Sequence, residues 1–242
     1  GEQGTGKSTL ARILRLLVDP IGEGGVGLTR PPRDDRDLFA IAANTHVIAL
    51  DNLTSIPPEL SDSLSALATG AGLQARRLYS DSDLTATYAR RPIIVNGIGS
   101  SGSDIAARPD LLDRALCVPL APVPDSIRAQ EADLWPEVRR IAPGVLADLL
   151  DAVSLALRRL PGLQLPPLPR MADFAAWVIA AEPALPWEEG TFLRVYAENR
   201  NAATGALLEA DPIAPHLQRL AEEGWTGTPS DLLRALENMT SE

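Results

Sequence analysis

The first residues of the chain have types and a spacing that suit the binding of phosphate groups. Gly1, Gly6, Lys7 and Ser8 stand at the spacing G-x-x-x-x-G-K-[ST], which is the Walker A pattern. In such a loop, backbone N–H groups surround the phosphates of a nucleotide, and the ammonium group reaches the β- and γ-phosphates. The predicted ATP-binding residues of the loop are Gly1, Gly4, Thr5, Gly6, Lys7, Ser8 and Thr9.

The use of basic residues supports this interpretation of the loop. Lys7 is the only lysine in the chain, and the other basic residues, out of 22, are arginines. Lysine carries a compact ammonium group on a flexible stem, whereas arginine carries a planar fork. The lone lysine therefore indicates a position that needs a point charge, as a phosphate loop does.

A helix is expected directly after the loop. Apolar residues recur at helical spacing from Leu10 to Leu17, and Pro20 ends the run. The loop would then open onto a helix N-terminus, which favours anions. The strand that precedes such a loop would lie before Gly1, so we expect the sequence to be a fragment that lacks this strand and is poorly stable alone.

Two apolar runs place polar residues where a nucleotide could reach them. The run 46–52 predicts a buried strand that ends at Asp51, a candidate Walker B acid, and the run 91–97 predicts a strand that ends at Asn96. Ligands of parallel α/β sheets bind at the carboxyl ends of the strands. Mg²⁺ is therefore expected between Ser8 and Asp51, which would bind it directly or through water.

The remaining pattern predicts two regions. Residues 1–121 are expected to form a parallel α/β sheet flanked by helices, with a hairpin insertion at about 73–90 and a further buried strand at 115–120. Residues 122–242 are expected to form an all-helical lid and C-terminal region. The helices predicted in this region cover 126–141, 144–160, 170–181, 188–210 and 227–239.

Composition excludes some classes of protein. The net charge of −10 argues against a protein that coats nucleic acid without specificity, although a local basic element is compatible with it. No apolar run reaches the roughly 18 residues that a membrane span needs. The single Cys117 excludes an intramolecular disulfide, and we expect a protein of the reducing cytoplasm with no membrane partner.

The order of these motifs resembles that of AAA+ ATPases. Walker A, Walker B, an Asn at the tip of the next strand, an Arg before the following strand and a helical lid occur in that sequence. The stretches at 50–81, 90–98 and 107–116 resemble, more narrowly, the ATPase domains of phage and mobile-element primase–helicase proteins, of the superfamily 3 and virulence-associated E kind. The resemblance covers roughly residues 1–200.

The resemblance implies a role for several residues. Asn96 would be sensor 1, which positions the attacking water or the γ-phosphate, and Arg170 would be sensor 2. Arg114 would be an arginine finger that acts on the nucleotide of a neighbouring subunit. Arg76 and Arg77 on the hairpin would contact nucleic acid, although a solvated edge hairpin explains both residues equally well.

One position departs from the implied pattern. Many relatives have a second acid, the general base, after the Walker B Asp, and here Asn52 stands in its place. An amide orients water but cannot take its proton. Because phosphoryl transfer depends mainly on positioning and charge stabilisation, slow hydrolysis is compatible with Asn52. Glu59 is an alternative base if the following helix folds back toward the site.

The sequence thus favours an ATP-binding protein that is the ATPase motor of a DNA helicase from a mobile element. It would use ATP and Mg²⁺, form a ring of identical subunits that we expect to be a hexamer, and have single-stranded DNA as a candidate partner. The alternative is an ATP-gated helicase loader or nucleotide switch with slow hydrolysis, which Asn52 favours.

Overall fold

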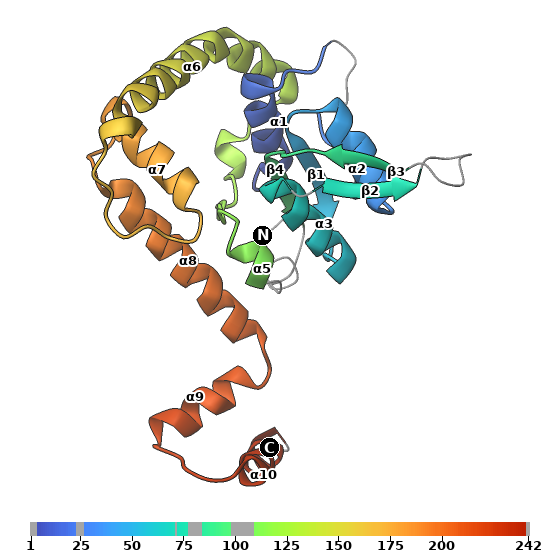
Figure 1. Cartoon of the computed structure of the whole chain (residues 1–242), viewed down its shortest axis with the longest axis vertical. Coiled ribbons are helices and arrows are strands. Elements are labelled where there is room, and N and C mark those ends of the chain that lie inside the picture. The colour runs from blue at the N-terminus through green and yellow to red at the C-terminus, as the bar shows by residue number, and fades with distance from the viewer. Residues whose placement is uncertain (1–3, 23–26, 71, 77–83, 98–108, 241–242) are drawn as a thin grey trace.

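The computed structural model describes residues 4–22, 27–70, 72–76, 84–97 and 109–240 (Figure 1). The chain forms a compact N-terminal region around a small sheet, a long helix that passes over it, and further helices that lead away to the C-terminus. Helices predominate, and the sheet is small. Predicted site residue Gly1 and predicted hairpin residue Arg77 lie outside the described residues.

The first region contains most of the elements that the sequence predicts. The helix after the loop, the strand that ends near Asp51, the hairpin and the strand that ends near Asn96 are all confirmed. The elements are α1 (Lys7–Val18), α2 (Asp35–Asn44), β1 (Ile48–Leu53), α3 (Pro58–Thr69), β2 (Gly72–Arg76), β3 (Leu84–Tyr88), β4 (Ile93–Gly97) and α5 (Pro109–Leu112).

The parallel sheet is smaller than the sequence suggests. Among the described residues, β1 pairs in parallel with β4, with Ile48 opposite Ile93, and an isolated bridge joins Thr29 to Leu50. Strands β2 and β3 form a separate antiparallel pair, as expected of the hairpin. The predicted α/β fold is therefore correct only in a loose sense. Among the described residues, its parallel sheet has two strands, and the segment at Thr29 adds a single bridge to β1.

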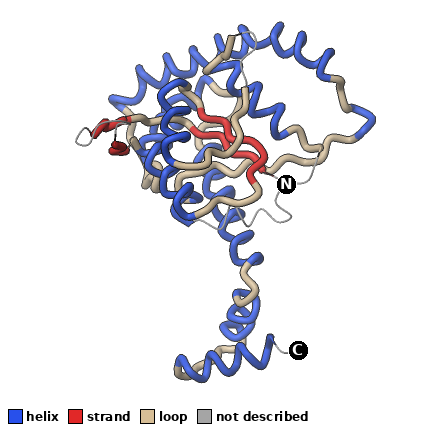
Figure 2. The backbone as a smooth tube through the Cα atoms, turned by 90° about the vertical axis from the view of Figure 1, so that its right-hand side faces the viewer, coloured by secondary structure: helices blue, strands red, loops and turns tan. Residues whose placement is uncertain are grey.

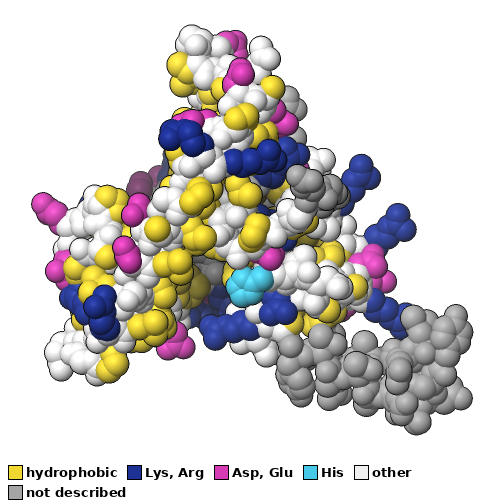
Figure 3. Space-filling model, turned by 90° about the horizontal axis from the view of Figure 1, so that it is seen from above, with side chains coloured by type: hydrophobic (Ala, Val, Ile, Leu, Met, Phe, Trp, Pro, Cys, Tyr) yellow, Lys and Arg dark blue, Asp and Glu magenta, His cyan; other side chains and the backbone are white. Residues whose placement is uncertain are grey.

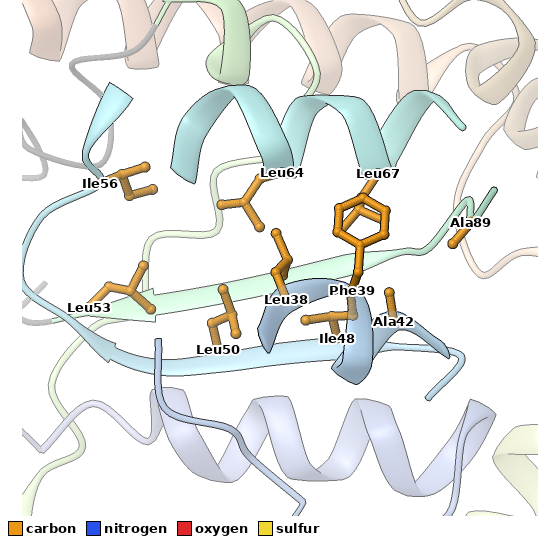
Figure 4. Close-up of a cluster of buried hydrophobic side chains, with 10 residues drawn as sticks. All are labelled: Leu38, Phe39, Ala42, Ile48, Leu50, Leu53, Ile56, Leu64, Leu67 and Ala89. Carbon is orange, nitrogen blue, oxygen red and sulfur yellow. The ribbon is translucent and has the colours of Figure 1, made fainter. Parts of the chain in front are cut away.

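Helices cover both faces of the β1–β4 pair. Alternate residues of β1 point to opposite faces, so Ile48 and Leu50 enter one apolar cluster, while Ala49 packs against Ala11 of α1 in the other. Figure 4 shows the larger cluster between β1 and α3, with α2 beside them. Its buried residues are Leu38, Phe39, Ala42, Ile48, Leu50, Leu53, Ile56, Leu64, Leu67 and Ala89.

Local signals set the bounds of these helices. Asp34 caps α2 by accepting a hydrogen bond from the backbone N–H of Asp37, at 2.9 Å. Helix α3 begins at Pro58 and ends before Gly70, whose φ of 85° is the left-handed conformation common after helices. These signals span only a few residues and act locally.

The second region is helical, as predicted, and Figure 2 shows helix throughout most of it. A 3₁₀ turn η1 (Asp125–Ile127) leads into it. The other elements are α6 (Glu131–Arg159), η2 (Leu160–Gly162), α7 (Ala172–Ala181), η3 (Glu182–Ala184), α8 (Thr191–Ala210), α9 (Ala214–Glu222) and α10 (Pro229–Thr240).

The prediction of separate helices at 126–141 and 144–160 is wrong, because α6 is one helix of 29 residues. Pro136 and Pro143 lie inside it, where each removes one backbone donor without ending the helix. Helix α6 packs against α1 and α7 on one side only. Large apolar side chains that remain exposed along it are Ile141, Val145, Leu146, Leu149, Leu150, Val153 and Leu157.

The prediction of a buried strand at 115–120 is also wrong. Leu116 and Val118 are exposed, and Cys117 is only half-buried. The backbone N–H of Cys117 donates to Asn199 Oδ1 at 3.0 Å, and the Asn199 amide donates back to the Cys117 carbonyl. A side chain of α8 thus replaces the neighbouring strand that this segment would need.

A buried carboxylate joins α7 to α8. Glu182, 1% exposed, accepts hydrogen bonds from Trp187 Nε1 at 3.3 Å and from the backbone N–H groups of Gly190 and Phe192 at 2.8 and 2.7 Å. We expect Glu182→Ala to lower the free energy of unfolding by about 2 kcal/mol, because it leaves buried donors unpaired. Chemical denaturation measures this, with exposed Glu188→Ala as the control, and equal stability of both variants would contradict it.

The last helices extend away from the rest of the molecule in both ribbon views (Figures 1 and 2). The predicted helix at 227–239 is confirmed as α10, and a capping box begins it, since Asp231 N donates to Thr228 Oγ1 at 3.3 Å and Thr228 N donates to Asp231 Oδ2 at 3.2 Å. Helix α9 was not predicted. In the part of the chain that the structure describes, no helix has the length and hydrophobicity to cross a membrane.

Candidate functional site

The loop before α1 has the backbone shape that an anion site needs. Gly4 and Gly6 have φ values of 77° and 76°, in the left-handed region that glycine adopts without strain. Their alternation with ordinary residues turns successive N–H groups toward one side. Lys7, the first residue of α1, donates from Nζ to Thr5 Oγ1 at 3.1 Å. The loop and the helix N-terminus thus favour negative charge at the same place.

The carboxyl ends of β1 and β4 bring the other predicted residues to this loop. Ser8 Oγ donates to Asp51 Oδ1 at 2.9 Å, across 43 residues of sequence. The backbone N–H of Asn52 donates to Asn96 Oδ1 at 3.2 Å. Parallel pairing of β1 with β4 explains the meeting of the two asparagines, since both strands end at one edge.

Asn52 and Asn96 both carry signs of a functional position. Asn52 has a φ of 60°, and it is the non-glycine residue with positive φ in the described chain. Asparagine tolerates this conformation better than most residues, at a cost that functional sites often contain. Asn96 Nδ2 is buried and has no hydrogen-bond partner in the structure. A buried donor without a partner is uncommon in a native fold and makes this side chain a candidate ligand contact.

These residues line one cavity of about 890 Å³. Its lining includes residues 4–9, the segment Thr29 to Pro31, and Asp51, Asn52 and Asn96. This volume suits a nucleotide. The predicted residues Gly4, Thr5, Gly6, Lys7, Ser8, Thr9, Asp51, Asn52 and Asn96 are therefore brought together.

The cavity is cationic, although the whole chain is acidic. Lys7, Arg12 and Arg30 line it, and Asp51 is the one carboxylate among its described lining residues. Arg12 Nη1 lies 3.2 Å from Glu131 Oε1 of α6, an exposed pair. The charge balance of the lining favours an anionic ligand.

Arg12, Arg30 and Arg128 were missed by the sequence analysis. Arg12 lies one helical turn after Ser8, so the i, i+4 spacing could have revealed it. Arg30 has no local signal in the sequence, because it reaches the cavity through the bridge between Thr29 and Leu50 of β1. A Cβ atom on Gly4 would lie 3.2 Å from Arg128 Nη2, so this arginine covers the loop from its other side.

A Mg²⁺ ion fits this site only together with a phosphate ligand. Among the described residues, no group of three or more His, Cys, Asp or Glu side chains could hold a metal by itself. Ser8 Oγ and Asp51 Oδ1 supply two hard oxygen atoms side by side. Mg²⁺ typically binds one or two protein oxygens plus substrate phosphates and water, and Ser8 and Asp51 would supply the protein oxygens of such a set.

The remaining predicted residues do not line this cavity. Arg114 and Arg170 line a second cavity, where Arg114 Nη1 donates to the Asp110 carbonyl at 2.7 Å and Arg170 Nη1 lies 2.6 Å from Asp113 Oδ2. Their roles as arginine finger and sensor 2 stay predictions, as does nucleic-acid contact by Arg76, which belongs to β2.

The alternative base, Glu59, is exposed in the first turn of α3 and is absent from the cavity lining. The structure therefore does not bring it to the phosphate loop. Asn52 remains the residue next to Asp51 in the cavity.

Fold and site define a mostly helical protein with a small parallel sheet and a cationic cavity at the carboxyl ends of its strands. Comparison with protein families matches residues 1–193 to the family described as actinomycete integrative conjugative element replication protein. The chain belongs to this family, so its place is in DNA replication of a mobile element.

This finding corrects the family assignment made from motif order. The resemblance to AAA+ ATPase domains of superfamily 3 and virulence-associated E primase–helicases is wrong, because the matching family is that of the conjugative-element replication proteins. The expected link to DNA replication and mobile elements is confirmed. Comparisons with curated proteins and with solved structures gave no significant match.

Proposed function

We propose that the cavity binds ATP with Mg²⁺ and that the protein hydrolyses ATP during replication of the element. The observation that carries the proposal is the contact of Ser8 with Asp51 beside a loop whose glycines have positive φ. The loop N–H groups and Lys7 would hold the phosphates. Mg²⁺ would supply charge neutralisation between Ser8, Asp51 and the phosphates.

Each polar residue of the cavity has a part in the proposed reaction. Asn96 Nδ2 would donate to the γ-phosphate or to the attacking water, which satisfies a buried group that otherwise lacks a partner. Arg30 would add positive charge to the lining. We also propose that the loop at residues 4–9, α1 and the β1–β4 pair together form a nucleotide-binding fold of the phosphate-loop type.

Binding of ATP by the wild-type protein is the experiment that tests this proposal. Isothermal titration calorimetry with ATP, with and without Mg²⁺, should show binding that Mg²⁺ strengthens. Phosphate release should then be measured with and without single-stranded DNA. Absence of ATP binding under both conditions would refute the proposal.

The proposal extends to assembly and movement on DNA. Arg114 lies outside the cavity of its own chain, so it could act on a nucleotide only from another copy. We propose a ring of identical subunits that uses ATP turnover as a helicase does. Stimulation of turnover by single-stranded DNA and by rising protein concentration would support it.

A second candidate is an ATP-gated loader or switch with slow hydrolysis. Asn52 favours it, because an amide beside Asp51 has no basic group to accept the proton of water. In this case ATP binding would set the conformation, and turnover would stay slow with DNA present.

Asn52→Asp separates these candidates by adding a carboxylate in the cavity. Asp also tolerates positive φ, so the fold should persist. A positioned general base typically raises a reaction rate at least about 100-fold. If base strength limits hydrolysis, we therefore expect Asn52→Asp to raise turnover by about ten-fold or more. Steady-state phosphate release measures this, with Asn201→Asp on α8 as the control, and unchanged turnover would show that Asn52 does not limit hydrolysis.

A further inference from the structure

A second cavity, of about 480 Å³, gathers arginines from three distant parts of the chain. Arg90 follows the β2–β3 hairpin, Arg114 follows α5, and Arg170 precedes α7. The cavity is separate from the phosphate loop, since the two linings share no residue. We propose that this second cavity binds a phosphate group presented by another molecule.

The charge of the lining supports an anionic ligand. Against the three arginines, Asp173 is the one carboxylate among the described lining residues, and its side chain is exposed. Asp113 pairs with Arg170, so Arg90 and Arg114 are the lining arginines without a described carboxylate partner, and this excess of positive charge favours an anion. Figure 3 shows basic side chains at several places on the face that it presents, among acidic, apolar and other side chains.

Two of the three guanidinium groups retain free donors for such a ligand. Arg90 is exposed, and the structure gives its guanidinium no hydrogen-bond or ion-pair partner among the described residues. Its stem is held across Gly70, where a Cβ atom would lie 3.5 Å from Arg90 Cβ. Arg114 is half-buried, and among the described residues its guanidinium bonds a backbone carbonyl, that of Asp110, and no carboxylate.

Arg170 is held in place rather than free. Asp113 accepts from Arg170 and from Arg200 of α8, so one carboxylate fixes two arginines. The two ion pairs of Asp113 join the segment after α5 to the start of α7 and to α8. A guanidinium that is already oriented binds an oxyanion at lower entropic cost.

A phosphate could reach this cavity from two sources. One is the backbone of single-stranded DNA beside the hairpin, which fits the replication family. The other is the nucleotide of a neighbouring copy, and this source rests on the proposed function. Both offer the same oxyanion to the same arginines.

The test uses the full chain with Arg90→Ala, because Arg90 has the fewest internal contacts. Fluorescence anisotropy with a labelled single-stranded oligonucleotide measures the DNA source, and phosphate release against protein concentration measures the nucleotide source. Arg140→Ala, on α6 and paired with Glu137, is the matched control. Arg90→Lys keeps the charge and should restore part of any loss.

If DNA supplies the phosphate, Arg90→Ala should weaken binding about five-fold or more and lower the salt slope by about 0.7, the value for one contact to a single strand. Unchanged DNA affinity with lost concentration-dependent turnover would identify the nucleotide source. Unchanged behaviour in both assays would overturn the proposal. The DNA assay needs no ATP, so a failed ATP-binding experiment leaves it informative.

Discussion

Lys7→Ala is expected to weaken binding of MgATP at least about 100-fold and to remove its hydrolysis. Lys7 lines the candidate cavity, and the proposed ligand needs its ammonium at the β- and γ-phosphates. Hydrogen bonds to charged groups are worth about 1.5–3 kcal/mol each, and about 2.7 kcal/mol corresponds to 100-fold in affinity. Isothermal titration calorimetry with MgATP measures the change.

Two further variants make this result specific. Lys7→Arg keeps the charge but replaces a point charge with a planar fork, so we expect it to restore only part of the affinity. Arg194→Ala removes an exposed cation on α8 and should bind MgATP as the wild type does. If Lys7→Ala binds MgATP like the wild type while its melting curve is unchanged, the cavity is not a nucleotide site.

The residues of this cavity were predictable because their signals are local. Walker A occupies one loop, and Asp51 and Asn96 each close an apolar run, so chain order alone places them at strand ends. Their meeting follows from parallel pairing, which β1 and β4 confirm. The motifs beyond this loop are short, so their order could not distinguish the conjugative-element replication proteins from other families.

Errors arose where a distant contact decides the outcome. The apolar segment at 115–120 has the composition of a strand, yet Asn199 binds its backbone from 82 residues away. Arg30 enters the cavity through the bridge at Thr29, which no periodicity reveals. The prolines of α6 indicate a break by local rules, but the helix continues through both. Such outcomes depend on tertiary contacts rather than on local propensity.

Asp19→Ala is expected to lower the free energy of unfolding by roughly 3 kcal/mol at neutral pH. Asp19 follows α1 and lies 2.8 Å from Nη2 of Arg15, which is 3% exposed. It also accepts from the backbone N–H groups of His46 and Val47, at 3.1 and 2.9 Å, just before β1. Asp19 is part-buried, and removing it leaves the buried Arg15 guanidinium without its carboxylate partner, which is the reason for the large cost.

Urea denaturation of Asp19→Ala measures this cost. Exposed Asp62→Ala on α3 is the matched control, and it should unfold like the wild type. Because Asp19 joins the end of α1 to the start of β1, its loss should loosen the scaffold of the cavity as well. Equal stability of the two variants would show that Arg15 is satisfied without Asp19.

The same carboxylate predicts how the difference should depend on pH. The hydrogen bond from Val47 N, together with Arg15, holds the pKa of Asp19 below its ordinary value of 3.8. A depressed folded-state pKa contributes stability that is complete above the unfolded value and is lost as pH falls through the folded value. The gap between the wild type and Asp19→Ala should therefore stay constant from neutral pH down to about 5 and shrink below about 4. A gap that persists after Asp19 is protonated would mean that its hydrogen bonds, rather than its charge, provide the stability.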